Sequence, residues 1–155
     1  MEIRDATAED AVGACAVMRR SITELCALDH RSDPALLARW LANKTPATVA
    51  QWIANLEASV LLACEGNTIL AVGSVSNAGE IMLNYVSPDA RFRGVSKMVL
   101  HALEERAIAR GNQRCRLIST VTARRFYLSA GYVEDGTSIN TFGMEGQPMS
   151  KALKP

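Results

Sequence analysis

The sequence predicts an α/β (α+β) fold in which helices cover both faces of a mixed, mostly antiparallel sheet of about seven strands. The chain has 155 residues, 48% of them apolar, which is enough to fill the core of one domain over residues 1–155. It shows no internal repeat, low-complexity run or linker. Helix-like and strand-like spacings of apolar residues follow one another along the chain, which predicts a layered domain of both kinds of element.

The N-terminal part predicts one short strand and three helices. Residues 2–7 have the composition of a strand, and apolar residues at helical spacing predict a helix over 8–28. An Asp-Pro pair and a Thr-Pro pair then place proline at the first helical position of segments 34–41 and 46–56. Both tryptophans of the chain lie in these last two segments, where core packing explains them best.

Three strands in series are predicted next, over residues 59–65, 68–76 and 79–86. The first two, "SVLLACE" and "TILAVGSVS", are separated by the turn Gly66-Asn67, which is typical of a β-hairpin. A second turn precedes "GEIMLNYV". Short turns of this kind join antiparallel neighbours, so we expect an antiparallel sheet here.

The C-terminal part alternates helices and strands. A helix is predicted over about 94–110, a strand over 114–120, a short helix over 123–130 and two final strands near 132–134 and 147–153. Strands joined through a helix are parallel and usually adjacent in the sheet. We therefore expect the strands before and after the first of these helices to be parallel neighbours in one mixed sheet.

Composition excludes several classes of protein. The four cysteines lie far apart without a C-x-x-C pair, and only two histidines accompany them, so we expect free buried thiols and no metal site. The N-terminus "MEIRDATAED" is not a secretory signal, and no apolar run is long enough for a membrane span. These features predict a cytoplasmic protein without a membrane partner.

Charge is unevenly distributed along the chain. Residues 91–125 carry nine basic and two acidic side chains, whereas the remainder carries eight basic and fourteen acidic ones. Such segregation favours an anionic partner on one side of the molecule. Arg106 and Arg110 suit the solvated face of a helix, but Arg91, Arg93 and Lys97 cluster around a glycine at the start of a helix.

This glycine-containing turn predicts an anion site. The first amides of a helix have no intrahelical acceptor and lie at the positive end of its dipole, so a phosphate is a natural ligand there. Gly94 removes a side chain where the anion must approach. No Walker motif and no G-x-G-x-x-G after a strand is present, which argues against ATP hydrolysis and dinucleotide binding.

Two motifs carry a resemblance to the GNAT (GCN5-related N-acetyltransferase) family. The stretch Arg91-Phe92-Arg93-Gly94-Val95-Ser96 resembles its signature [QR]-x-x-G-x-[GA], with Ser96 in place of glycine or alanine. The stretch "TVTARRFYLSAGY" resembles the second motif of the family, with Thr120 where asparagine is common. The resemblance covers nearly the whole chain and implies the fold of that family.

The resemblance implies acetyl-CoA as acyl-donor co-substrate, without a metal. The pyrophosphate is expected on the amides of residues 93–97, and the pantetheine arm on the backbone of residues 84–86, in the gap between the diverging strands. The residues that the resemblance places at the acetyl-CoA site are Tyr85, Val86, Arg91, Phe92, Arg93, Gly94, Val95, Ser96, Lys97, Thr120, Arg124 and Tyr127.

Acyl transfer to an amine needs a base, an oxyanion donor and an acid for the leaving thiolate. The resemblance makes Tyr127 the acid, although a tyrosine there also suits core packing. Glu80 matches the family's base, but it is equally a turn residue, and His30 or a chain of waters are the alternatives. His101, beside two glutamates, is interpreted as a surface residue. The amide near Val86 is expected to meet the oxyanion.

The sequence therefore predicts an acetyl-CoA-dependent N-acetyltransferase that acts on a primary amine of a small molecule or a protein. The alternative is a non-catalytic acyl-CoA-binding or regulatory module with the same fold. A nucleic-acid partner is disfavoured, since only 5% of residues are aromatic. Segment 21–56 is expected to form a wall of the acceptor site without specifying its chemistry. The chain outside residues 91–125 is acidic overall, which favours a cationic acceptor. The resemblance is compatible with a homodimer.

Overall fold

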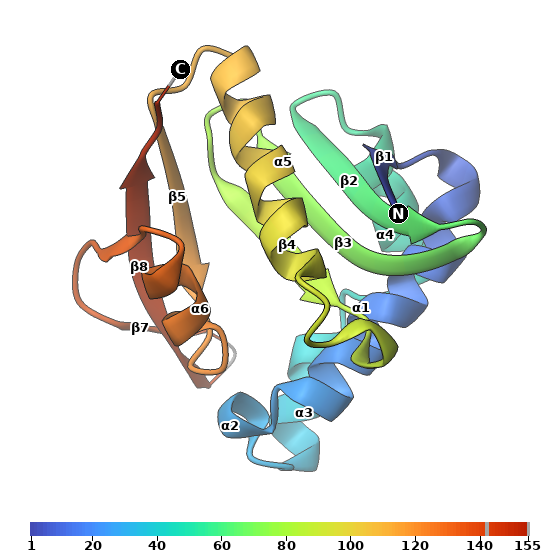
Figure 1. Ribbon diagram of the computed structural model, residues 1–155. Helices are drawn as coiled ribbons and strands as arrows, with labels where there is room; N and C mark the ends of the chain where they lie inside the picture. The colour runs from blue at the N-terminus through green and yellow to red at the C-terminus, as the bar shows by residue number, and fades with distance from the viewer. Residues whose placement is uncertain (142, 155) are drawn as a thin grey trace.

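The computed structural model describes residues 1–141 and 143–154, which form two antiparallel sheets with helices around them (Figure 1). The first sheet has the order β1-β2-β3-β4, and the second joins β5, β8 and β6, with β7 also paired to β8. The strands are β1 (Glu2–Asp5), β2 (Ala58–Glu65), β3 (Thr68–Ser76), β4 (Ile81–Val86), β5 (Arg114–Ser119), β6 (Val133–Glu134), β7 (Ile139–Thr141) and β8 (Met144–Ala152). The predicted fold class is confirmed, with the three-residue β7 as an addition.

Helices cover both faces of the first sheet, as predicted. Helices α1 and α4 pack on one face and α5 on the other, between the two sheets (Figure 1). The helices are α1 (Ala11–Leu25), α2 (Ala27–His30), α3 (Pro34–Leu41), α4 (Pro46–Ala54), α5 (Val95–Ala109) and α6 (Arg124–Ser129). None of the described helices combines the length and apolar character required to cross a membrane.

Helix starts follow the local sequence. The side chain of Asp33 accepts from the amide of Ala35 at 2.9 Å, and that of Thr45 accepts from the amide of Thr48 at 3.2 Å, so each caps a helix whose first residue is proline. The helix predicted over 8–28 is instead divided into a 3₁₀ turn, α1 and α2. The division between α1 and α2 falls at Cys26, whose backbone leaves the helical region.

Strands β4 and β5 are parallel neighbours, as predicted, but they pair only at one end, so the single mixed sheet that was predicted is divided into two. A single parallel bridge joins Glu80 to Arg116, where the amide of Arg116 donates to the carbonyl of Gly79 at 3.0 Å. A Cβ at Gly79 would lie 2.5 Å from the Arg114 carbonyl oxygen, so only glycine allows this approach. Beyond the bridge the strands diverge and leave a wedge between the sheets (Figure 1).

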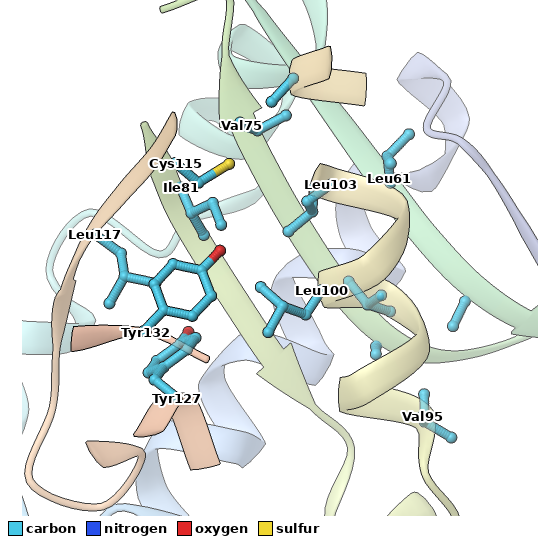
Figure 2. Close-up of a cluster of buried hydrophobic side chains, with 14 of the residues drawn as sticks. Leu61, Val75, Ile81, Val95, Leu100, Leu103, Cys115, Leu117, Tyr127 and Tyr132 are labelled. Carbon is cyan, nitrogen blue, oxygen red and sulfur yellow. The ribbon is translucent and has the colours of Figure 1, made fainter. Parts of the chain in front are cut away.

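Helix α5 packs at the junction of the two sheets. Figure 2 shows Leu100 and Leu103 of this helix facing Ile81 of β4, with Leu117 of β5 beside them; all four are buried. Burying each such side chain stabilises the fold by roughly 1.5–3 kcal/mol. The core therefore holds the sheets at the closed end of the wedge.

A buried polar network also joins α5 to the second sheet. The Tyr132 hydroxyl donates to a Glu104 carboxylate oxygen at 2.8 Å, and Lys151 of β8 donates to the same carboxylate at 3.1 Å. The four cysteines are free and buried, as predicted.

Candidate functional site

A cavity of about 440 Å³ opens in the wedge, and we call it the α5 cavity. Strand β4, the first turn of α5, the end of β5 and helix α6 line it, with the last turn of α1 at its side. Of the predicted acetyl-CoA residues, those that line it are Tyr85, Val86, Arg91, Phe92, Gly94, Val95, Ser96, Lys97, Thr120 and Tyr127. Residues from two motifs that lie far apart in sequence thus meet at one cavity.

The first turn of α5 presents unpaired amides to this cavity. Gly94 is the N-cap, with φ 75° and ψ 11°, and the first helical hydrogen bond runs from the Met98 amide to its carbonyl at 3.1 Å. The amides of Val95, Ser96 and Lys97 therefore have no intrahelical acceptor. A Cβ at Gly94 would meet nothing within 4 Å, so this open space is accessible to an anion.

The predicted cations divide into two groups. Arg91 and Lys97 line the cavity, and the Arg91 guanidinium lies 4.6 Å from the ring centre of Phe92, which is 92% exposed. Arg93 instead pairs with Glu65 on the β2–β3 hairpin at 2.8 Å. Only the main chain of Arg93 belongs to the turn.

Arg124 is also directed elsewhere. Its guanidinium pairs with Glu134 of β6, and the residue does not line the α5 cavity. The two predicted arginines that miss the cavity share one reason, since each has a carboxylate close enough to form an ion pair outside it.

Tyr127 combines a buried ring with a hydroxyl directed toward β4. Its ring packs edge-on against those of Phe126 and Tyr132, with centroid distances of 5.2 and 5.6 Å. Figure 2 shows Tyr127 beside Tyr132. The side-chain amide of Asn84 donates to its hydroxyl at 3.2 Å. Burial raises the pKa of the Tyr127 phenol to about 12, and the hydrogen bond from Asn84 opposes this rise. The phenol is thus protonated at neutral pH and is a weaker acid than an exposed tyrosine.

The backbone of Asn84 was expected at the site, but its side chain was not. It lines the α5 cavity, and its Oδ1 atom is buried without a hydrogen-bond partner among the described residues. A buried acceptor without a partner is costly, so a donor from a ligand would stabilise it. The signal in the sequence was an asparagine within the otherwise apolar strand "IMLNYV".

The backbone of β4 is open on the wedge side. The Ser87 amide donates to the Leu70 carbonyl at 2.7 Å, and Val86 lies opposite Ala71. In an antiparallel pair hydrogen-bonded and non-hydrogen-bonded positions alternate, so the peptide groups of Val86 and Asn84 point away from β3 and into the wedge.

The predicted bases lie outside the cavities. Glu80 is exposed at the closed end of the wedge and lines neither cavity, so its role as a base stays a prediction. His30 is buried, with one ring nitrogen 3.0 Å from the Ile22 carbonyl and the other accepting from the Ser32 amide at 3.0 Å. Both nitrogens of His30 are therefore engaged with the backbone. His101 is exposed beside Glu105, as expected.

A second cavity of about 490 Å³, the α4 cavity, lies on the other side of β4. Trp40, Lys44 and Trp52, from the segment expected to line the acceptor site, form one wall, and the β7–β8 hairpin forms another. The residues shared by both cavities are Met82, Leu83, Tyr85, Ile118 and Thr120. The cavities therefore meet where β4 and β5 diverge.

Tyr85 connects the two sides of this meeting point. Its hydroxyl accepts a hydrogen bond from the Trp40 indole at 3.3 Å. Burial raises the pKa of Tyr85 above its ordinary range, so its hydroxyl is neutral at neutral pH.

In the described part of the chain no three His, Cys, Asp or Glu side chains converge as a metal site would require.

The fold and the wedge site can now be compared with known proteins. The family model described as the acetyltransferase (GNAT) domain matches residues 26–153. The chain therefore belongs to the GNAT acetyltransferase family. No curated protein sequence matches it significantly.

Solved structures show the same fold over the whole chain. A GCN5-related N-acetyltransferase from Rhodopseudomonas palustris has 26% identity and a TM-score of 0.87, with 98% of this chain and 95% of that chain covered. The PaiA N-acetyltransferase of Thermoplasma acidophilum, solved with coenzyme A, has 20% identity and a TM-score of 0.85 over 97% and 98% of the two chains. A ribosomal-protein-alanine N-acetyltransferase from Brucella melitensis has 20% identity and a TM-score of 0.76 over 99% and 100%.

Proposed function

We propose that the protein is an acetyl-CoA-dependent N-acetyltransferase that transfers the acetyl group to a primary amine. One observation carries the proposal: the α5 cavity, with unpaired helix amides at one end and a tyrosine hydroxyl at the other, meets the α4 cavity in the wedge. Two substrates can thus approach one point from opposite sides of β4. The relative from T. acidophilum, which holds coenzyme A, supports the assignment of the donor.

The residues of the α5 cavity fit acetyl-CoA. The amides of Val95, Ser96 and Lys97 would donate to the pyrophosphate oxygens, with Arg91 and the Lys97 ammonium adding positive charge. The open peptide groups of Asn84 and Val86 would pair with the amides of the pantetheine arm. This arm would occupy the wedge as an additional strand.

The chemistry follows from where the thioester would lie. The amine nitrogen attacks the carbonyl carbon, the carbon–sulfur bond breaks, and the amine proton passes to water or to a carboxylate reached through water. The Val86 amide is directed into the wedge and suits the developing oxyanion. The Tyr127 hydroxyl would donate a hydrogen bond to the leaving thiolate. Its raised pKa makes complete proton transfer less favourable than for an ordinary phenol.

Two measurements test the proposal. Calorimetry should detect binding of coenzyme A, and a screen of amines with acetyl-CoA should give amine-dependent release of free thiol. Binding without thiol release for amines, polyamines, amino acids and peptides would favour the non-catalytic acyl-CoA-binding module. Absence of coenzyme A binding would contradict both assignments.

A further inference from the structure

Lys44 in the connection between α3 and α4 is a buried cation without an acidic partner among the described residues. Its side chain lines the α4 cavity, and the residue is 5% exposed. The ammonium donates to Asn43 Oδ1 at 2.7 Å and lies 3.5 Å from the Trp40 carbonyl oxygen. An ammonium group has three donors, so one remains for a further acceptor.

The surroundings hold Lys44 in place. Its amide donates to the Leu41 carbonyl at 2.9 Å, and its own carbonyl accepts from Arg19 at 2.8 Å and from the Cys15 thiol at 3.1 Å. The ammonium also lies 5.8 Å from the ring centre of Trp52. The backbone contacts fix the main chain of Lys44, and the contacts to Asn43, Trp40 and Trp52 place its ammonium in the cavity.

A buried ammonium without a counter-ion is costly. Desolvation lowers the pKa of Lys44 from 10.5 to about 8, with the nearby Cys15 opposing the shift. An anion bound beside it would offset this cost and keep the amine charged.

The carboxylates of the α4 cavity do not supply that anion. Asp29 accepts from the amides of Val121 and Thr122 at 2.7 and 3.1 Å and also from the Thr122 hydroxyl, so its oxygens are already engaged. Glu145 belongs to the β8 wall and is exposed. Neither carboxylate forms an ion pair with Lys44.

We infer that the acceptor carries an anionic oxygen group, a carboxylate or a phosphate, which accepts from Lys44 while the amine of the acceptor reaches the wedge. The inference rests on the proposed acetyl transfer. It makes Lys44 a specificity-determining residue, and the substrate class is an amine with an acidic group at its other end.

The experiment compares paired acceptors with acetyl-CoA. Straight ω-amino acids with two to six carbons are tested beside their carboxamides, which have the same shape without the charge, and beside ω-aminoalkylphosphonates. At the best length we expect kcat/KM for a charged acceptor to exceed that of its amide by roughly 10- to 100-fold, as for hydrogen bonds to charged groups. A higher kcat/KM for the amino acids than for the phosphonates would indicate a carboxylate, and the reverse order would indicate a phosphate.

Lys44→Met keeps an unbranched side chain that lacks only the terminal ammonium position, and it removes the charge. We expect it to abolish the preference for the acid while the amide keeps its rate. Lys154→Met, at an exposed lysine outside both cavities, should keep the preference. Equal rates for acid and amide at every length in the wild type would overturn the inference, as would an undiminished preference in Lys44→Met.

Calorimetry separates this inference from the proposed function. The same acids are titrated into the protein saturated with coenzyme A. Acid binding that is at least tenfold weaker in Lys44→Met, without acetyl transfer to any amine, would support the anion site and contradict the enzyme. Acetyl transfer that ignores the acidic group would support the enzyme and contradict the anion site.

Discussion

Asn84 determines how the Tyr127 hydroxyl is presented to the wedge. Because the Asn84 amide donates to the phenol oxygen, the phenol proton is free to point toward the cavity. We expect Tyr127→Phe to lower kcat by about 10- to 100-fold, at or below the usual contribution of a general acid, because the bond to the leaving thiolate is lost together with the one from Asn84. The ring packing is retained in this variant. Calorimetry should therefore give an unchanged affinity for coenzyme A, and full activity would make Tyr127 purely structural.

Glu80 can reach the amine only through water, because it lies outside both cavities. If its carboxylate relays the proton, Glu80→Gln should lower kcat at neutral pH by at most about 10²-fold, the low end of general-base effects. The loss should diminish at higher pH, where more of the amine is already neutral. A pH–rate profile identical to that of the wild type would assign the deprotonation to water alone.

Lys44 should make the stability of the protein depend on pH. Its pKa is about 8 in the folded protein and 10.5 ordinarily, so between these values the unfolded chain binds more protons and stability rises with pH. Below pH 8 the full cost of the buried charge is present. We expect Lys44→Met to melt higher than the wild type at pH 7 and the difference to shrink toward pH 10.5.

The comparison of the two proteins also removes the largest part of the contribution of Cys15, which comes from burial; only the smaller part of its pKa shift caused by the Lys44 charge remains. Burial raises the pKa of that thiol, so its own effect on stability has the opposite sign, but it is present in both proteins. A difference in melting temperature that does not change between pH 8 and pH 10.5 would contradict a buried charged Lys44.

Some site residues were predictable from the sequence because they lie in continuous motifs. Gly94 and Tyr127 belong to this group. The side chains of Arg93 and Arg124 were not, because the carboxylates that draw them away, Glu65 and Glu134, come from other segments. Lys44 was missed for the same reason, since distant contacts to α1 bury it and no motif contains it.

At the scale of the elements, the first turn of α5 is the feature most directly open to test. Gly94→Val places a side chain in the space that the pyrophosphate would occupy, so we expect coenzyme A affinity to fall at least tenfold, the cost of about one charged hydrogen bond. The positive φ also adds roughly 1–2 kcal/mol of strain.

Gly111→Val is a matched control for this strain. Gly111 follows the other end of α5, has φ 88°, and a Cβ there also meets nothing within 4 Å. It should lose similar stability and keep its affinity for coenzyme A in calorimetry. Equal losses of affinity in the two variants would mean that the strain, and not the blocked anion site, weakens binding.

Most helices and strands were predictable from local signals, namely proline after a capping residue and the turns between strands. Strand β7 was missed because three exposed or half-buried residues, paired only to β8, give no periodic pattern. The divergence of β4 from β5 was expected only from the family resemblance, because it depends on how whole strands pair. The register shift between Ser74 and Val75 and the close contact at Gly79 are visible only in the fold.

At the scale of the whole molecule, the concentration of basic residues in segment 91–125 was predictable. Which of these residues line a cavity and which form ion pairs was only partly predictable. Arg93, Arg106 and Arg124 of the basic segment form ion pairs with Glu65, Asp5 and Glu134, so they hold the fold together. Such exposed pairs each contribute about 0–1 kcal/mol. Arg91 and Lys97 are the two basic side chains of this segment that line the α5 cavity, so they carry the expected attraction for an anionic partner.

The open edge of β4 also affects how the protein behaves when its site is empty. Unpaired strand edges are templates on which strands of other molecules can add, and they promote aggregation. The wedge leaves the peptide groups of Asn84 and Val86 in this condition. We expect the ligand-free protein to scatter more light than the coenzyme A complex during slow heating at high concentration. Equal scattering would show that side chains already shield the edge, whereas a difference would make coenzyme A a useful additive for storage and crystallisation.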